Sequence, residues 1–127
     1  MIEFDKLSLE NLAKRCRKNI LDSSLSAGAS SAHFGGGLSI VEILTVLYGS
    51  IMNHKPSEPL WEERDRLILS KGHGCLGLYA VLAEFKYISH DELLSFEKSP
   101  LQPITLIISF KGKGPFLSKN WFSDILL

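Results

Sequence analysis

The chain has only two cysteines among its 127 residues, with no Cys-x-x-Cys spacing. Cys16 and Cys75 both fall on the apolar sides of predicted helices, so we expect reduced, buried thiols of the kind found in cytoplasmic proteins. The sequence also lacks an excess of charge of one sign, because 14 basic residues balance 14 acidic ones. A balanced chain has no overall field to attract nucleic acid, so we expect no nucleic-acid partner.

Long hydrophobic runs are absent as well. No stretch approaches the length needed to cross a bilayer, and the first residues have neither a basic start nor a long apolar core. We therefore expect neither export nor membrane insertion. The densest basic run, residues 14–18, is interrupted by a core-facing cysteine, which favours a solvated helix face over a ligand site.

Two helices are predicted in the first half of the chain. Apolar residues recur at helical spacing over residues 9–25, and the basic run occupies the opposite face of that helix. A second helix is predicted to begin at Ser39, because Ser39 and Glu42 form the Ser-x-x-Glu pattern of a capping box. An apolar stripe continues this helix to about Met52.

A short strand and two further helices are predicted in the second half. Residues 67–69 are apolar and are expected to form a buried strand, followed by a helix over residues 75–85. Ser89 and Glu92 repeat the capping-box pattern for a short helix that ends near Lys98. A strand that leads into a helix through a glycine turn indicates an α/β arrangement. One strand forms no sheet alone, so we expect an incomplete α/β fold, mostly helical with one or two short strands.

The composition changes after Lys98. Residues 99–127 contain no Ala, Val, Glu, Arg or His, although residues 104–110 are apolar enough for a strand. We therefore expect a partial domain over residues 1–98 and an unmatched tail over residues 99–127.

Two glycine-flanked histidines are the candidate functional residues. His33 is followed by Gly35, Gly36 and Gly37 ahead of the predicted helix at Ser39. The N–H groups of a helix N-terminus attract anions, and glycines allow a phosphate to approach the backbone, so this turn is a candidate phosphate site. Taken alone, a triple glycine is as often a tight turn, and a lone histidine is more often structural.

The second motif places His73 between Gly72 and Gly74 at the carboxyl end of the predicted strand. Ligands bind at this end of strands in open α/β sheets. A histidine there can donate to a phosphate oxygen or move a proton to or from a hydroxyl group. Lys71 either adds positive charge to such a site or is simply solvated.

Together the two motifs resemble the N-terminal thiamine-diphosphate-binding domain of transketolase, especially the form encoded as a separate N-terminal subunit. The resemblance extends from about residue 9 to residue 98. It is carried by Ser31–Leu44, by Arg64–Gly74 and by Leu78-Tyr79-Ala80.

The resemblance implies transfer of a two-carbon ketol unit between sugar phosphates, with thiamine diphosphate as nucleophile and electron sink. It places the protein in cytoplasmic pentose phosphate and carbohydrate metabolism. It also implies a C-terminal transketolase subunit or a second copy of the chain as partner. His33 and His73 would be catalytic. The implied cofactor contacts are His33, Gly35, Gly36, His73 and Gly74.

The family's metal motif is missing from this sequence. Transketolases bind Mg²⁺ or Ca²⁺ through a Gly-Asp-Gly motif and a following Asn, and no Gly-Asp-Gly occurs here. Without a divalent cation, helix ends and histidines offset the negative charge of a diphosphate poorly. The resemblance therefore implies a truncated or frame-shifted fragment that is inactive by itself, with no metal ligands of its own.

Two other hypotheses remain open at this stage. One is a non-catalytic helical interaction module whose histidines are structural and whose exposed apolar faces bind a partner. The other is a zinc site built from histidines, which is disfavoured because the spacing is wide and no carboxylate or cysteine lies at helical spacing beside any pair. The zinc ligands in that hypothesis are His33, His54, His73 and His90.

Overall fold

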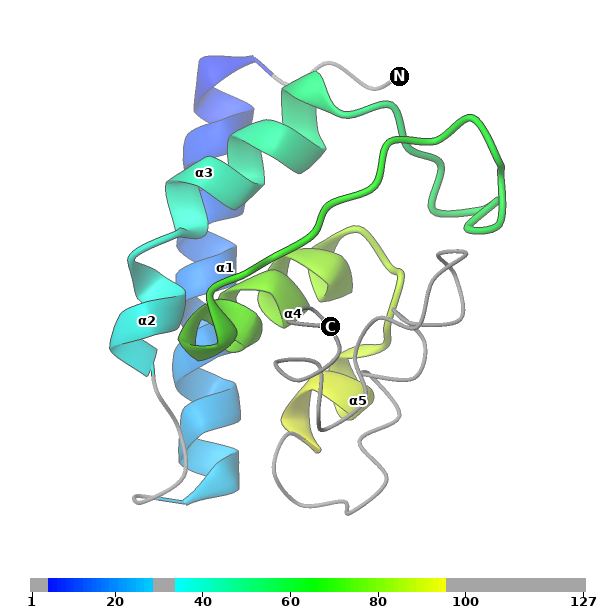
Figure 1. Ribbon diagram of the computed structural model, residues 1–127. Helices are drawn as coiled ribbons and strands as arrows, with labels where there is room; N and C mark the ends of the chain where they lie inside the picture. The colour runs from blue at the N-terminus through cyan, green and yellow to red at the C-terminus, as the bar shows by residue number, and fades with distance from the viewer. Residues whose placement is uncertain (1–4, 29–33, 96–127) are drawn as a thin grey trace.

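The computed structural model describes residues 5–28 and 34–95, and Figure 1 shows their arrangement. All regular elements in these two ranges are helical. They are α1 (Lys6–Ala27), α2 (Phe34–Leu38), α3 (Val41–Val46), the π-helical turn η1 (Leu47–Ile51), the 3-10 turn η2 (Gly72–Gly74), α4 (Cys75–Glu84) and α5 (His90–Leu94).

Helix α1 is the longest element and confirms the helix predicted over residues 9–25. It begins at Lys6 because the side chain of Asp5 accepts a hydrogen bond from the backbone N–H of Ser8 at 2.8 Å. Hydrogen bonds from the Ser8 side chain and from its backbone N–H hold the pKa of the Asp5 carboxyl below its usual value. The helix ends at Gly28, whose φ of 97° is open to glycine and strained for other residues.

Helix α4 lies at the centre of the described part and contacts α1, α2, α3 and α5. Its residues 76–82 are all buried, and a helix that is apolar on all sides is typical of a core position. It confirms the helix predicted over residues 75–85. The core cluster also takes Leu12, Cys16 and Ile20 from α1.

The glycine-rich segment and the helix after it differ from the prediction. The glycines lie inside α2, and α3 begins only at Val41. Ile40 is the N-cap residue and makes no side-chain capping bond, so the capping box predicted for Ser39 and Glu42 is wrong. The predicted end near Met52 is confirmed, because η1 ends at Ile51.

Residues 53–71 connect η1 to η2 without a strand, so the short strand predicted over residues 67–69 does not form. Figure 1 shows the end of this connection as an elongated trace that leads to α4, and no turn or bend interrupts residues 65–71. A strand requires hydrogen bonds to a neighbouring strand, and the described ranges offer none. The described part is thus mostly helical, and the α/β architecture is not confirmed.

Helix α5 confirms the second capping box. The Ser89 side chain accepts from the backbone N–H of Glu92 at 3.1 Å, and the Glu92 carboxylate accepts from the Ser89 N–H at 2.6 Å. The helix ends at Leu94, and Lys98, near which its end was predicted, lies outside the described residues. The Ser23 hydroxyl, on α1, donates to the Leu93 carbonyl at 2.8 Å and ties α5 to α1.

None of the described helices is both long enough and apolar enough to cross a bilayer.

Candidate functional site

The structure brings the two glycine–histidine segments of the sequence together. Helix α2, which begins one residue after His33, packs against η2, which contains His73. The contact is so close at Gly36 that a Cβ atom there would lie 2.4 Å from the backbone oxygen of His73. Since real Cβ atoms do not approach an oxygen this closely, only glycine fits at position 36 without a shift of the backbone.

A second glycine pair continues this contact along α4. A Cβ on Gly77 would lie 2.7 Å from the oxygen of Gly37, and a Cβ on Gly37 would lie 3.0 Å from the Gly77 nitrogen. Two backbones thus pass each other without intervening side chains. Position 35 differs, because a Cβ on Gly35 would meet nothing within 4 Å. Gly36 and Gly37 therefore serve helix packing, and only Gly35 leaves open space.

Ser39 and Lys71 join the same two segments by polar contacts. Lys71 Nζ donates to Ser39 Oγ at 2.8 Å, and Ser39 Oγ donates to the Gly36 carbonyl oxygen at 2.8 Å. This chain of bonds explains why Ser39 does not cap α3. The sequence prediction missed the contact, since nothing in either motif shows that residues 39 and 71 meet.

The site residues predicted from sequence occupy different environments. His73 lies two residues before α4 and is exposed, whereas Gly74 is buried, with its Cα facing the Ile40 side chain. His33 lies outside the described residues. The junction of α2 and η2 therefore places Gly36 against His73, with Gly35 next to Gly36 in the chain, and the role of each stays a prediction.

This junction fits a phosphate group in part. An ammonium group has three N–H donors and an imidazole has up to two, and both Lys71 and His73 reach the surface. No group of three His, Cys, Asp or Glu side chains able to hold a metal ion occurs in residues 5–28 and 34–95. Donors for phosphate oxygens are thus present, and nothing in these ranges supports a zinc site.

His54 has a structural role in this fold. Its Nε2 lies 2.6 Å from the Tyr48 carbonyl oxygen, and its Nδ1 lies 2.8 Å from the Tyr87 hydroxyl. A carbonyl oxygen only accepts, so Nε2 carries a proton; with a single ring proton, Nδ1 accepts from the Tyr87 hydroxyl. His54 thereby fastens the start of the 53–71 connection to the helices.

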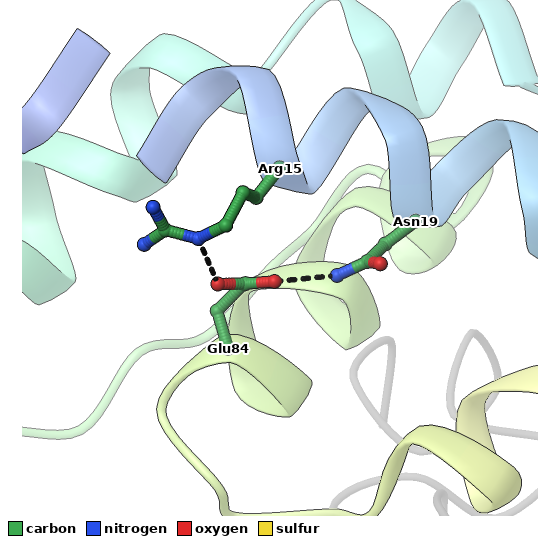
Figure 2. A network of polar contacts seen from close by, with 3 residues as sticks. All are labelled: Arg15, Asn19 and Glu84. Atoms are coloured by element: carbon green, nitrogen blue, oxygen red, sulfur yellow. Dashed lines mark hydrogen bonds and ion pairs between the residues drawn. The ribbon is translucent and has the colours of Figure 1, made fainter. Parts of the chain in front are cut away.

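A polar network between α1 and α4 also escaped the sequence prediction. Figure 2 shows the Glu84 carboxylate between two α1 side chains: Arg15 Nε donates to one oxygen at 2.7 Å, and Asn19 Nδ2 donates to the other at 2.8 Å. Arg17 pairs with Glu42 on α3. The basic run is therefore an exposed helix face, as predicted, and its arginines also link helices.

Close to this network lies Cys16, which confirms the prediction of a buried, reduced thiol at this position. Its side chain is fully buried, and burial raises the pKa of the thiol to about 12. A thiol with so high a pKa stays protonated and unreactive at neutral pH. Cys75 forms no disulfide within the described residues and is only half-buried, so the prediction of a fully buried thiol is wrong at this position.

The class of the protein follows from the similarity of its sequence to known proteins. Residues 10–100 match the family described as transketolase, thiamine diphosphate binding domain. The match covers most of the chain, so the protein belongs to this family.

Particular relatives include components of two specialised transketolases. The chain is 43% identical over 91 residues to one subunit of the apulose-4-phosphate transketolase of Actinobacillus succinogenes, and the match covers 72% of this chain and 33% of that relative. It is 46% identical over 78 residues to a 6-deoxy-6-sulfo-D-fructose transketolase subunit of a Clostridium species, which covers 61% of this chain and 28% of the relative. Transketolase 2 of Vibrio parahaemolyticus is 41% identical over 71 residues, or 55% of this chain and 11% of the relative. The chain thus spans about a third or less of the curated relatives that it matches.

Proposed function

We propose that this chain supplies part of the thiamine diphosphate site of a transketolase-type enzyme, which transfers a two-carbon ketol unit between sugar phosphates. The observation that carries the proposal is the close packing of Gly36 on the backbone of His73. This contact joins the two motifs by which the chain resembles the family, although 37 positions separate them. Membership of the thiamine diphosphate binding family supports the same conclusion.

In this proposal the chain's own residues hold the cofactor's diphosphate. His73 donates an N–H to a phosphate oxygen, and Gly35 leaves the backbone beside it open. Gly74 is the further proposed contact, through its backbone. Gly36 brings this turn against α2. His33, the residue before that helix in the sequence, is proposed as a further contact of the same cofactor. When bound, thiamine diphosphate supplies the nucleophile and electron sink for ketol transfer.

The two histidines are also the proposed catalytic residues. An imidazole near the sugar hydroxyls donates or accepts a proton there, and this is the role we assign to His33 and His73. Lys71, held by Ser39, keeps the His73 turn against the glycine helix.

The chain alone is proposed to be inactive. Its sequence has no Gly-Asp-Gly, and the carboxylates of the described residues form no metal-binding group. A divalent cation normally offsets the charge of the diphosphate, so the site needs a contribution from elsewhere. We propose a C-terminal transketolase subunit or a second copy of the chain as partner, with residues 1–98 as the partial domain and residues 99–127 as an unrelated tail.

The substrate class is proposed from the family, because the relatives act on sugars that bear phosphate or sulfonate groups according to their names. Sugar phosphates are accordingly the proposed substrates, in the cytoplasm, as part of pentose phosphate metabolism.

Titration calorimetry with thiamine diphosphate and magnesium tests the cofactor site. We expect heat of binding for the unchanged chain and its loss in His73→Ala. His90→Ala is the matched control, because His90 is an exposed histidine that lies on α5. Absence of heat at millimolar cofactor, or equal heat in His73→Ala, would contradict the proposal.

A helical interaction module is the second candidate function. Two observations favour it: both ring nitrogens of His54 bond to other parts of the fold, and Ile43, Ile51 and Ile68 are each more than 60% exposed. Large apolar side chains that are exposed to this degree are available for contact with a partner. Co-expression with a C-terminal transketolase subunit separates the two, because a stable complex without ketol transfer favours the module and a complex with transfer favours the enzyme.

A further inference from the structure

A pocket of about 510 Å³ lies between helix α1, the start of the 53–71 connection and the end of α4. None of its lining residues belongs to the junction of α2 and η2. Pockets that bind small molecules usually have volumes of about 300–1,000 Å³, a mostly apolar lining and a few charged or polar groups that orient the ligand. The pocket at the end of α4 has both the volume and this kind of lining.

Three elements contribute the apolar part of the lining. Leu12 on α1 is almost fully buried, and Pro56 and Phe85 are half-buried. A hydrocarbon group that enters the pocket leaves water for these side chains, and this transfer favours binding.

Arg15 brings hydrogen-bond donors to the pocket that the described part of the fold does not use. Its Nε donates to Glu84 Oε2 at 2.7 Å, and Figure 2 shows both terminal nitrogens turned away from that carboxylate. These two nitrogens form no hydrogen bond with any described residue, and the side chain is 53% exposed. The N–H groups of a guanidinium bind a carboxylate through two parallel hydrogen bonds.

Lys86 adds a second positive charge on an unusual backbone. Its φ of 62° is left-handed, and no other residue in the described ranges has a positive φ except glycine. Glycine is the usual residue just after a helix in this conformation, because a Cβ atom is strained there. The Lys86 ammonium forms no ion pair with a described residue. Strained backbone positions cluster at sites that bind ligands.

We propose that this pocket binds a small monocarboxylic acid with an aryl or alkyl group. Arg15 and Lys86 bring two positive charges and Glu84 brings one negative charge, which leaves one positive charge for a ligand. A monocarboxylate balances that charge, whereas a diphosphate exceeds it. The carboxylate bonds to the Arg15 terminal nitrogens and the Lys86 ammonium, and the hydrocarbon group packs against Leu12 and Phe85. This site is independent of the proposed cofactor site.

NMR titration of the full chain with 3-phenylpropionate tests the site. We expect the backbone amide signals of Ser57, Phe85 and Lys86 to shift, with saturation in the millimolar range. The neutral analogue 3-phenylpropanamide has nearly the same shape and should bind at least about tenfold more weakly, because it forms no ion pair. Equal binding of the acid and the amide would overturn the proposal, and so would the absence of these shifts at about 10 mM acid.

Substitutions of Lys86 separate loss of binding from loss of the fold. Lys86→Gly relieves the left-handed backbone, so its melting temperature should rise while its affinity for 3-phenylpropionate falls at least about fivefold. Lys86→Arg keeps the charge and should bind within about twofold of the unchanged chain. The matched control is Lys14→Gln, which removes an exposed charge of α1 outside the pocket and should also bind within about twofold.

Three results with these variants would overturn the proposal. Unchanged affinity in Lys86→Gly would show that Lys86 does not bind the acid. An equal loss in Lys14→Gln would mean that the acid responds to the overall charge of the chain. Shifts confined to Gly36 and His73 would place the acid at the junction of α2 and η2. Failure here leaves the cofactor proposal intact, since the calorimetry with His73→Ala tests that separately.

Discussion

The α1–α4 interface and residues 67–70 both contain isoleucine, but the side chain is buried in one region and exposed in the other. At the interface, Ile20 is fully buried and Glu84 receives hydrogen bonds from both Arg15 and Asn19. In residues 67–70, Ile68 is 63% exposed, and the backbone groups form no hydrogen bonds with the described residues. Apolar sequence is therefore not sufficient for burial, because a segment is buried only where a neighbour completes its packing and its hydrogen bonds.

Alanine at the two isoleucines should give the largest contrast. Ile20→Ala leaves a cavity in the core and should lower the free energy of unfolding by about 3 kcal/mol. Ile68→Ala removes a mostly exposed side chain and should change it by less than about 0.5 kcal/mol. Urea unfolding followed by circular dichroism measures both, and equal losses would contradict the described burial.

The glycine contact between α2 and η2 should respond next in magnitude. Gly36→Ala places a methyl group against the His73 carbonyl and should lower the free energy of unfolding by about 1–3 kcal/mol. Gly35→Ala has open space and should raise it by about 0.5–1 kcal/mol through helix propensity. The same denaturant titration compares the two, and a sign opposite to either expectation would count against this contact.

Loss of the carboxylate at the α1–α4 interface should have a smaller effect. Glu84→Ala leaves the largely buried Asn19 amide without its acceptor and should cost about 2 kcal/mol. The control is Glu10→Ala, whose pair with Lys6 is exposed at 3.9 Å and should contribute at most about 0.5 kcal/mol. Thermal unfolding of the three proteins at low salt provides the measurement.

The buried thiol of Cys16 should make stability depend on alkaline pH. Its pKa is 9.0 in an unfolded chain and about 12 in the fold. The folded state therefore holds the proton more tightly, and the stabilising effect is complete below pH 9 and is lost as pH rises toward 12. We expect a loss of about 1 kcal/mol between pH 9 and pH 10, measured by urea unfolding.

Cys16→Ala should remove this dependence, and Cys75→Ala should keep it because the Cys16 thiol is then still present. The measurement stays below pH 10 because burial also raises the pKa of the Tyr48 hydroxyl. An unchanged slope in Cys16→Ala would assign the dependence to another group.

An effect of similar size to that of Cys16 is expected where His54 holds the 53–71 connection. Tyr87→Phe removes the hydroxyl that donates to His54 Nδ1 and should lower the free energy of unfolding by about 1 kcal/mol. Hydrogen exchange should quicken near Asn53 and Asp65, whose backbones are bonded to each other in this connection. Unchanged exchange there would mean that His54 does not hold the connection.

Predictions from the sequence held where a few neighbouring residues suffice. The helix over residues 9–25 and the capping box of Ser89 and Glu92 depend on residues within about one helical turn of each other, and both are confirmed. The capping box at Ser39 failed although its pattern is identical, because Lys71 and the Gly36 carbonyl compete for the same hydroxyl.

The candidate site was predicted only in its separate pieces. The sequence singled out His73 and the triple glycine, and it interpreted all three glycines as clearance for a phosphate. In the structure Gly36 and Gly37 are occupied by packing against His73 and Gly77. That difference could not be foreseen, since it depends on two backbones that approach each other from distant parts of the chain.

The sequence by itself determined the helical stripes, the helix ends at Asp5 and Ser89, and the family to which the chain belongs, because these follow from local periodicity, local hydrogen bonds and residue identity. Tertiary structure decided which glycines pack, which partner Ser39 bonds, and that residues 67–70 stay unpaired within the described part. These outcomes depend on contacts between residues far apart in the chain. A side chain or a backbone group takes whichever partner the folded chain brings within bonding distance.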